Sequence, residues 1–124
     1  PLACAAALEL IEVMEKENLP GRALEISDRV FARANEWKEK YEVVGDVRGV
    51  GCMLGIEFVT DKLSKKPNTA LVNAIVNEAV QNGLLLENAG TYGNVIRFLA
   101  PLVITDEQLN AGLDIFENAI AKLS

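Results

Sequence analysis

The 124-residue sequence contains no histidine and only two cysteines, and both shortages narrow the chemistry open to it. Cys4 and Cys52 lie far apart and lack the close spacing of a zinc or redox pair, and there is no histidine to complete a metal-binding set. The absence of imidazole also removes the commonest general base and every nucleophile that relies on a histidine partner. We therefore expect neither a metal centre nor histidine-assisted catalysis.

Basic residues are also scarce: 12 lysines and arginines stand against 18 acidic residues, for a formal net charge of -6. Lys62, Lys65 and Lys66 form the only basic cluster, in a stretch typical of a solvated loop. This balance argues against binding to nucleic acid, whose phosphates attract clustered positive charge. No apolar run approaches the length of a membrane span, and the beginning of the chain lacks the basic flank of a signal peptide. We expect a soluble, cytoplasmic protein with reduced cysteines.

Apolar residues, in contrast, make up half of the chain, and the mean hydropathy is +0.17. Such a composition is typical of a globular protein, and the length predicts one domain that spans residues 1–124. The chain opens with a proline that runs straight into a helix-favouring stretch, and no capping residue precedes it. Removal of an initiator methionine would produce this beginning, and so would a cut through a longer chain.

The hydrophobic periodicity predicts helices at both ends and mostly strands between them. Apolar residues at helical spacing indicate helices over residues 2–17 and 22–40, with a break at 18–21, and a third helix from about residue 70 that stops at Gly83. Thr105 and Gln108 form a capping box that opens a last helix. We expect strands within residues 43–50, then at 52–59, 84–87 and 95–100. Because several connections are short, the sequence predicts an α+β fold with a small, mostly antiparallel sheet covered on one face by helices.

Three motifs before residue 60 have simple structural explanations. The glycines of "GVGCMLG" (49–55) resemble a dinucleotide loop, but a strand follows them where that loop requires a helix, so a bend is the better interpretation. Asp46 and Arg48 are expected to form an exposed pair beside a turn. The alternation of the strand places Glu57 on the polar face of the sheet, where an acid needs no special explanation.

Arg97 interrupts the apolar stretch "NVIRFLAPL" and is the most conspicuous candidate for a functional side chain. Alternation places it with Val95 and Leu99, opposite Ile96 and Phe98, so it points away from the core if the second set packs against the helices. A guanidinium on a stiff strand is well suited to bind a carboxylate through two parallel hydrogen bonds. A salt bridge to an Asp or Glu of the chain is the simpler explanation and is slightly favoured on physical grounds, but the residues alone leave both explanations open.

Three segments together resemble the C-terminal part of class III pyridoxal-phosphate aminotransferases, and most closely the 4-aminobutyrate aminotransferases. They are "PLACAAALELIEVMEKENL", "VGDVRGVGCMLGIEFV" and "GTYGNVIRFLAPLVITDEQL", and the resemblance covers essentially the whole chain in order. It implies the C-terminal small domain of a homodimeric enzyme, with residues 1–17 leading in from an absent large domain. It also implies transfer of an amino group from an ω-amino acid, such as 4-aminobutyrate, to 2-oxoglutarate on pyridoxal phosphate.

The resemblance gives Arg97 the role of binding a substrate carboxylate, because it matches the arginine of the family's "IRFLAPL" stretch. Gly90 and Gly93, in the loop before that strand, are expected to form part of the cleft wall. None of the seven lysines matches the lysine that holds the cofactor, so we expect no catalytic residue, no bound pyridoxal phosphate and no transamination from the chain alone.

Two other functions remain open from the residues. In one alternative, the chain is a self-contained α+β module. It binds a small carboxylate at Arg97 without catalysing a reaction, or it has a regulatory role. In the other it is a structural interaction domain, where Arg97 matters only to stability. If a large domain is absent, the face that meets it is expected to be partly apolar and to favour self-association.

Overall fold

The computed structural model describes all 124 residues and contains four helices and four strands. In chain order these are α1 (Leu2–Lys16), α2 (Leu19–Lys40), β1 (Val44–Val50), β2 (Met53–Phe58), α3 (Thr69–Gln81), β3 (Glu87–Ala89), β4 (Val95–Phe98) and α4 (Asp106–Leu123). The predicted α+β class is confirmed, as is the order of the elements.

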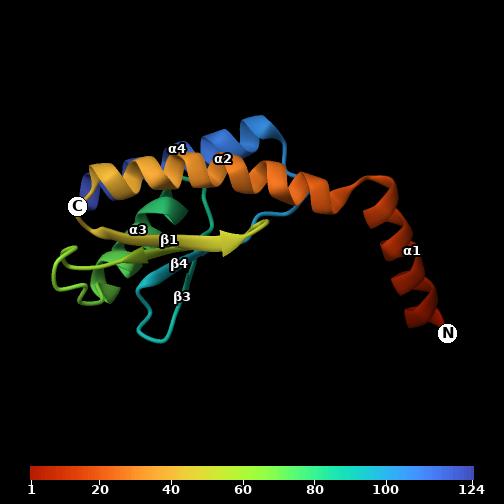
Figure 1. Cartoon of the computed structure of the whole chain (residues 1–124), viewed down its shortest axis with the longest axis horizontal. Coiled ribbons are helices and arrows are strands. Elements are labelled where there is room, and N and C mark those ends of the chain that lie inside the picture. The colour runs from red at the N-terminus through yellow and green to blue at the C-terminus, as the bar shows by residue number, and fades with distance from the viewer.

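The strands form one four-stranded sheet in the order β1-β2-β4-β3, and each neighbouring pair is antiparallel. The long helices α2 and α4 lie side by side over one face of this sheet (Figure 1). A two-residue loop joins β1 to β2, and its first residue, Gly51, has a φ of 57°, a conformation that favours glycine. The mostly antiparallel sheet, covered on one face, is thus confirmed.

The core lies between the helices and the sheet. Its largest members are the fully buried Trp37 of α2, Phe58 of β2 and Phe116 of α4. The ring centroids of Trp37 and Phe116 lie 5.2 Å apart in an edge-to-face arrangement, which aromatic pairs prefer. Residues at every second position of β2 also face this core and are at most 1% exposed, namely Leu54, Ile56 and Phe58. The helix-facing side of the sheet is therefore the side that stabilises the fold.

A group of charges joins α2 to α4 at the rim of the core. Arg33 donates to Asp114 at 2.9 Å and to Glu117 at 2.7 Å, and Lys40 donates to Glu117 at 3.0 Å. The pKa of Glu117 is lowered to about 2. The indole N–H of Trp37 is the largest cause, although it forms no hydrogen bond of good geometry; burial opposes the shift, and Arg33 and Lys40 add to it.

The capping box at the start of α4 is confirmed. The backbone N–H of Gln108 donates to the Thr105 hydroxyl at 3.2 Å, and that of Thr105 donates to the Gln108 side chain at 3.1 Å. Two donors that the first helical turn leaves free are thereby satisfied, which explains why this boundary was predictable.

Two elements begin three residues away from their predicted starts, and the other boundaries differ by smaller amounts. The sequence predicts a break at residues 18–21, yet α2 begins at Leu19. Pro20 lies in its first turn, where the backbone N–H that proline lacks would have no helical partner. The predicted strand 84–87 overlaps β3 only at Glu87, because β3 forms a hairpin with β4 around the turn at Gly90–Gly93. Residues 84–86 precede that hairpin and lie outside the sheet.

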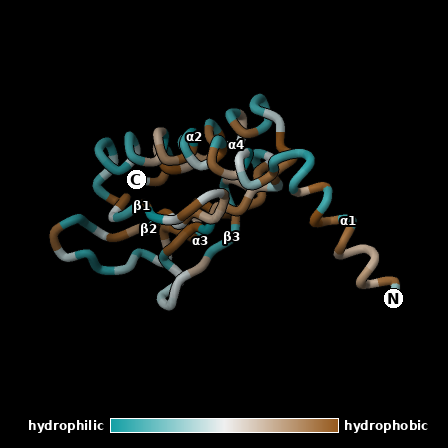
Figure 2. The backbone as a smooth tube through the Cα atoms, turned by 45° about the vertical axis from the view of Figure 1, so that its right-hand side comes forward, coloured by the Kyte–Doolittle hydropathy of each residue, from teal (hydrophilic) through white to brown (hydrophobic).

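Helix α1 extends away from the body and contains no buried residue (Figures 1 and 2). Leu8, Ile11 and Met14, which the periodicity placed on one face, are 65%, 53% and 38% exposed. Figure 2 shows hydrophobic segments along this protruding helix. None of the helices combines the length and the apolar character needed to cross a membrane.

Candidate functional site

Arg97 lies on the open face of the sheet, opposite the helices, as its strand alternation predicted. In the sheet register it is the partner of Gly55 in β2 and of Glu87 in β3. Its neighbour Ile96 is fully buried on the helix side, whereas 38% of the Arg97 side chain is exposed. Because Gly55 has no side chain, no side chain projects from the strand position next to Arg97 on this face.

The partner of Arg97 within the chain is Glu87. The terminal nitrogen Nη2 of Arg97 donates a hydrogen bond to Oε2 of Glu87, and the two charges form an ion pair. The Nε atom of Arg97 is shielded from solvent and has no hydrogen-bond partner. The salt bridge that the residues left open is therefore present, but it does not satisfy the whole guanidinium.

Asn94 and a tight turn hold β4 in place. The buried side chain of Asn94 donates to the carbonyl of Phe58 at 3.0 Å, and the carbonyl of Asn94 accepts from the N–H of Phe58 at 2.7 Å. Gly90 and Gly93 have φ angles of 81° and 62° and are joined by a hydrogen bond from Gly93 N to Gly90 O of 3.0 Å. These contacts fix the direction of the strand that carries Arg97.

The two glycines also allow close contacts inside the chain. A Cβ at Gly90 would lie 2.9 Å from Cγ2 of Val95, and one at Gly93 would lie 3.3 Å from Cγ2 of Thr69. The turn itself therefore explains both glycines. Their predicted place in a cleft wall stays a prediction.

A cavity of about 310 Å³ lies beside Arg97, between the segment that enters β3, the segment that leaves β4, and helix α4. Arg97 and Glu87 are its charged lining residues, and most of its other lining is apolar: Leu84, Leu85, Leu86, Phe98, Leu99, Ala100, Ile104 and Leu109. An apolar surrounding weakens the screening of charge by water. The cavity is therefore a candidate site for an anionic ligand with an apolar part.

Asp46, Arg48 and Glu57 of strands β1 and β2 are also charged, and they pair with one another or with Lys38 of α2. Arg48 donates to Glu57 at 2.6 Å and to Asp46 at 3.1 Å, and Lys38 donates to Asp46 at 3.0 Å. The hydrogen bond to Glu57 is the largest cause that raises the pKa of Arg48. The expected pairing of Asp46 with Arg48 is confirmed, and Glu57 lies on the polar face as predicted.

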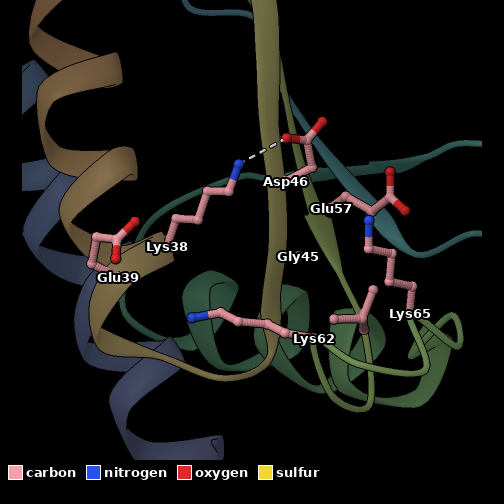
Figure 3. A pocket seen from close by; sticks show the side chains of 8 residues that line it. Lys38, Glu39, Gly45, Asp46, Glu57, Lys62 and Lys65 are labelled. Atoms are coloured by element: carbon pink, nitrogen blue, oxygen red, sulfur yellow. Dashed lines mark hydrogen bonds and ion pairs between the residues drawn. The ribbon is translucent and has the colours of Figure 1, made fainter.

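A second cavity, of about 540 Å³, lies beside these pairs and is lined by lysines and acids in equal number (Figure 3). Lys62 and Lys65, from the predicted basic loop, point toward it together with Lys38, and the acids are Glu39, Asp46 and Glu57. Lys38 is engaged with Asp46. Such a mixed lining favours neither anions nor cations, so this cavity is a weaker candidate than the one beside Arg97.

The glycine-rich stretch 49–55 turns β1 back into β2 and opens no helix. Gly49 has a φ of 147°, and a Cβ there would lie 2.3 Å from the carbonyl oxygen of Met53. The interpretation as a bend is thus confirmed. Within the same stretch, Cys52 is buried and donates to the carbonyl of Ala100, and burial raises the pKa of its thiol, which disfavours the nucleophilic thiolate.

No lysine lines the cavity beside Arg97. Four of the seven form ion pairs elsewhere, namely Lys38, Lys40, Lys62 and Lys122. No three histidine, cysteine or acidic residues are arranged to hold a metal ion.

Comparison with known proteins places the chain in a family. The family model described as "Aminotransferase class-III" matches residues 1–120. The chain belongs to the class III aminotransferases. Within this family it is 47% identical over 117 residues to a probable 4-aminobutyrate aminotransferase of Bacillus subtilis, which covers 94% of the chain and 27% of that protein.

Another relative is the 5-aminovalerate aminotransferase DavT of Pseudomonas putida, 44% identical over the whole chain and 29% of its own length. Among solved structures, an aminotransferase of Bacillus anthracis superposes with a TM-score of 0.89 at 30% identity, over 98% of this chain and 28% of that one. The chain therefore spans less than a third of the length of the class III aminotransferases that it matches.

Glu87 is the residue of this site that the sequence analysis did not single out. The spacing around the turn contains the signal. Ala89 pairs with Val95, and moving two residues away from the turn along each strand places Glu87 opposite Arg97. An opposite charge pair across two antiparallel strands is a common stabilising contact. The misplaced strand at 84–87 concealed this register.

Proposed function

We propose that the chain is the C-terminal small domain of an aminotransferase that moves an amino group from an ω-amino acid to 2-oxoglutarate. Two relatives carry the names of 4-aminobutyrate and 5-aminovalerate aminotransferases, which supports a donor with amino and carboxylate groups at opposite ends of a short apolar chain. We favour 4-aminobutyrate as the donor. In this proposal residues 1–17, which include the protruding α1, lead in from a large domain.

Arg97 carries this proposal. Its guanidinium is on the open face of the sheet and is only partly satisfied by Glu87, and the residue is among those that line an apolar cavity. We assign to it the binding of the substrate carboxylate through two parallel hydrogen bonds. A fixed carboxylate also fixes the distance and direction of the amino group at the other end of the substrate, which lowers the entropic part of the barrier. The turn at Gly90 and Gly93 would form the adjacent wall.

Pyridoxal phosphate is the cofactor of class III aminotransferases, and the residues of this chain do not fit it. The cofactor needs a lysine for its aldehyde, an acid beside its ring nitrogen and a cradle for its phosphate. The Arg97 cavity has no lysine in its lining. The chain's part in the reaction is therefore to bind and orient substrate, and we propose that the large domain supplies the rest. The complete enzyme is proposed to be a cytoplasmic homodimer.

The first test is to mix the purified chain with pyridoxal phosphate, reduce the mixture with borohydride, and locate the label by intact mass and peptide mapping. We expect slow, scattered labelling of exposed lysines, because no lysine is placed to hold the aldehyde. Stoichiometric labelling of a single lysine would mean that the chain binds its own cofactor, and the proposal would be wrong.

The second test concerns the carboxylate. In the complete enzyme, Arg97→Ala is expected to lower kcat/KM for 4-aminobutyrate or 2-oxoglutarate roughly 100-fold, as the loss of a bidentate, charged hydrogen-bonded contact implies. Arg29→Ala is the matched control, because Arg29 is an exposed arginine that pairs with Asp106, and neither residue lines this cavity. An equal effect of the two substitutions would contradict the assigned role.

The alternative is that the chain is a self-contained module that binds a carboxylate. The same observation supports it, because Arg97 and the cavity beside it both lie within the chain. This function predicts that the isolated chain binds glutamate or 2-oxoglutarate with one-to-one stoichiometry and loses that binding in Arg97→Ala. Calorimetry on the isolated chain separates the two functions, because the domain proposal predicts no such binding without the large domain.

A further inference from the structure

Gly55 is the only glycine of β2, and it lies in a row of residues that crosses the whole sheet. Its register partners are Arg48 of β1 and Arg97 of β4, and Arg97 in turn pairs with Glu87 of β3. The row belongs to the open face, because Ile56, the next residue after Gly55, is fully buried on the helix side. The row therefore contains three charged side chains and one gap, and the gap is next to Arg97.

The backbone does not require a glycine at this position. Gly49, in comparison, has a φ of 147°, and a Cβ there would lie 2.3 Å from a backbone oxygen. Gly55 is not among the glycines with a positive φ, and a Cβ there would lie 3.3 Å from Cγ1 of Val95 and 3.9 Å from the carbonyl oxygen of Arg48. Only the contact with Val95 is tight, and it involves a side chain that has to move by a few tenths of an ångström. An alanine therefore fits this strand after a small adjustment.

A glycine inside a strand weakens the sheet, because it loses much conformational freedom on folding and offers no side chain to its neighbours. Where the fold does not require it, such a glycine often marks a place that a ligand approaches closely. The surroundings of Gly55 fit a ligand. Arg97 beside it donates to Glu87 alone, its buried Nε has no acceptor, and it is among the residues that line the apolar cavity.

We propose that Gly55 is a specificity-determining residue of the site at Arg97, where it leaves room for the aliphatic chain of the substrate. This inference rests on the proposed function of Arg97. A substrate whose carboxylate is bound by the guanidinium has to place its next carbons beside that group. At Gly55 they lie directly against the backbone of β2. A side chain at position 55 would occupy this space and keep the substrate away from the arginine.

The test adds side chains of increasing size at position 55 of the complete enzyme. Gly55→Ala is expected to raise the KM for 4-aminobutyrate about threefold, and Gly55→Val about tenfold or more, as the overfilling of a tight space implies. The KM for n-butylamine, an amine without a carboxylate for Arg97, is expected to stay nearly the same. Val50→Phe is the matched control, because Val50 is 82% exposed on the open face of β1, a strand that does not pair with β4.

Stability distinguishes a glycine that makes room for a ligand from one that the fold needs. Alanine has fewer conformations than glycine in the unfolded chain, so Gly55→Ala is expected to leave the thermal unfolding midpoint unchanged or to raise it slightly. A clearly lowered midpoint would show that Gly55 serves the packing of Val95. That result would overturn the inference, whatever the function of Arg97.

The kinetic outcomes separate this inference from the function on which it rests. An unchanged KM for 4-aminobutyrate in Gly55→Val would overturn the role of Gly55. Equal rises for both amines would overturn it as well, because the space would then accommodate something other than a substrate held at Arg97, such as the backbone of the large domain. Arg97→Ala is measured with the same two amines. If it lowers kcat/KM equally for both, or for neither, the carboxylate-binding function of Arg97 is contradicted independently of the result at position 55.

Discussion

The two faces of the sheet are built for different purposes, although the same strands supply both. On β2, Leu54 and Ile56 face the helices and are 1% and 0% exposed. Between and beside them, Gly55 and Glu57 face the other way, toward Arg48 and Arg97. One face is therefore apolar and closed within this chain. The other is charged, open, and carries the candidate site.

The charged groups of the molecule differ in the same way. Where Arg33, Lys40 and Glu117 join α2 to α4, each group has an opposite charge close by, and Arg33 and Glu117 each have two. Arg97 has a single partner on an edge strand. A saturated cluster holds two helices together, whereas an unsaturated arginine keeps capacity for a ligand. The contrast distinguishes structural charges from candidate binding charges in one small domain.

The largest expected effect comes from the same truncation made on the two faces. Leu54→Ala is expected to lower the free energy of unfolding by about 2–5 kcal/mol, because it leaves a cavity in a packed core. Leu99→Ala, just after β4 and 59% exposed, is expected to change it by less than about 1 kcal/mol. Urea denaturation of the two variants measures both values. Similar losses in the two proteins would mean that the open face is packed in solution.

A smaller effect is expected for Glu117→Gln, which removes the charge shared by Arg33 and Lys40. With a quarter of the Glu117 side chain exposed, the loss of stability is expected to be about 1–2 kcal/mol at pH 7. The pKa of Glu117 is lowered in the folded protein from 4.5 to about 2, so its contribution is complete above the ordinary pKa and is lost as the pH falls from about 4.5 to about 2.

Denaturant unfolding of wild type and Glu117→Gln at several pH values checks this dependence. The difference between the two proteins is expected to shrink steadily below pH 4.5 as the carboxylate of the wild type becomes protonated. Glu36→Gln, on the exposed side of α2, is the control for a general loss of negative charge. A difference that stays constant across this pH range would show that the Glu117 carboxylate does not hold α2 and α4 together.

The helix-facing side was predictable from sequence because it follows rules of short range. Three features depend only on neighbours a few residues away. They are the capping box at Thr105 and Gln108, the alternation around Ile56, and the face of the sheet to which Arg97 belongs. The start of α2 was misplaced because Pro20 ends helices in their interior but is tolerated in a first turn. The Glu87–Arg97 pair was missed because it depends on a hairpin register, and a small error in a strand position changes every partner.

Stability should hardly respond to the residues of the candidate site. Glu87→Gln is expected to change the free energy of unfolding by about 0.5 kcal/mol or less, because the pair is partly exposed. Any effect on carboxylate affinity in this variant then arises in the site itself. Thermal unfolding of wild type and variant provides the measurement. A loss well above 1 kcal/mol would assign Glu87 a structural role. The Glu87–Arg97 pair would then stabilise the fold, as the Arg33–Glu117 pair does.

The smallest effect on unfolding is expected at the protruding helix, where nothing is buried. Deletion of residues 1–16 should leave the unfolding midpoint of the rest nearly unchanged, since α1 contributes no residue to the core. The same deletion should weaken self-association, because Leu8, Ile11 and Met14 expose apolar surface on this helix. Sedimentation velocity over a range of concentrations measures the association of the two chains. Replacement of these three residues by glutamine in the full chain distinguishes the effect of the apolar surface from the effect of a shorter chain. A wild-type chain that stays monomeric at high concentration would show that the apolar surface of α1 does not drive association. The two faces of the sheet would then be the remaining evidence for an open, unpacked surface on this chain.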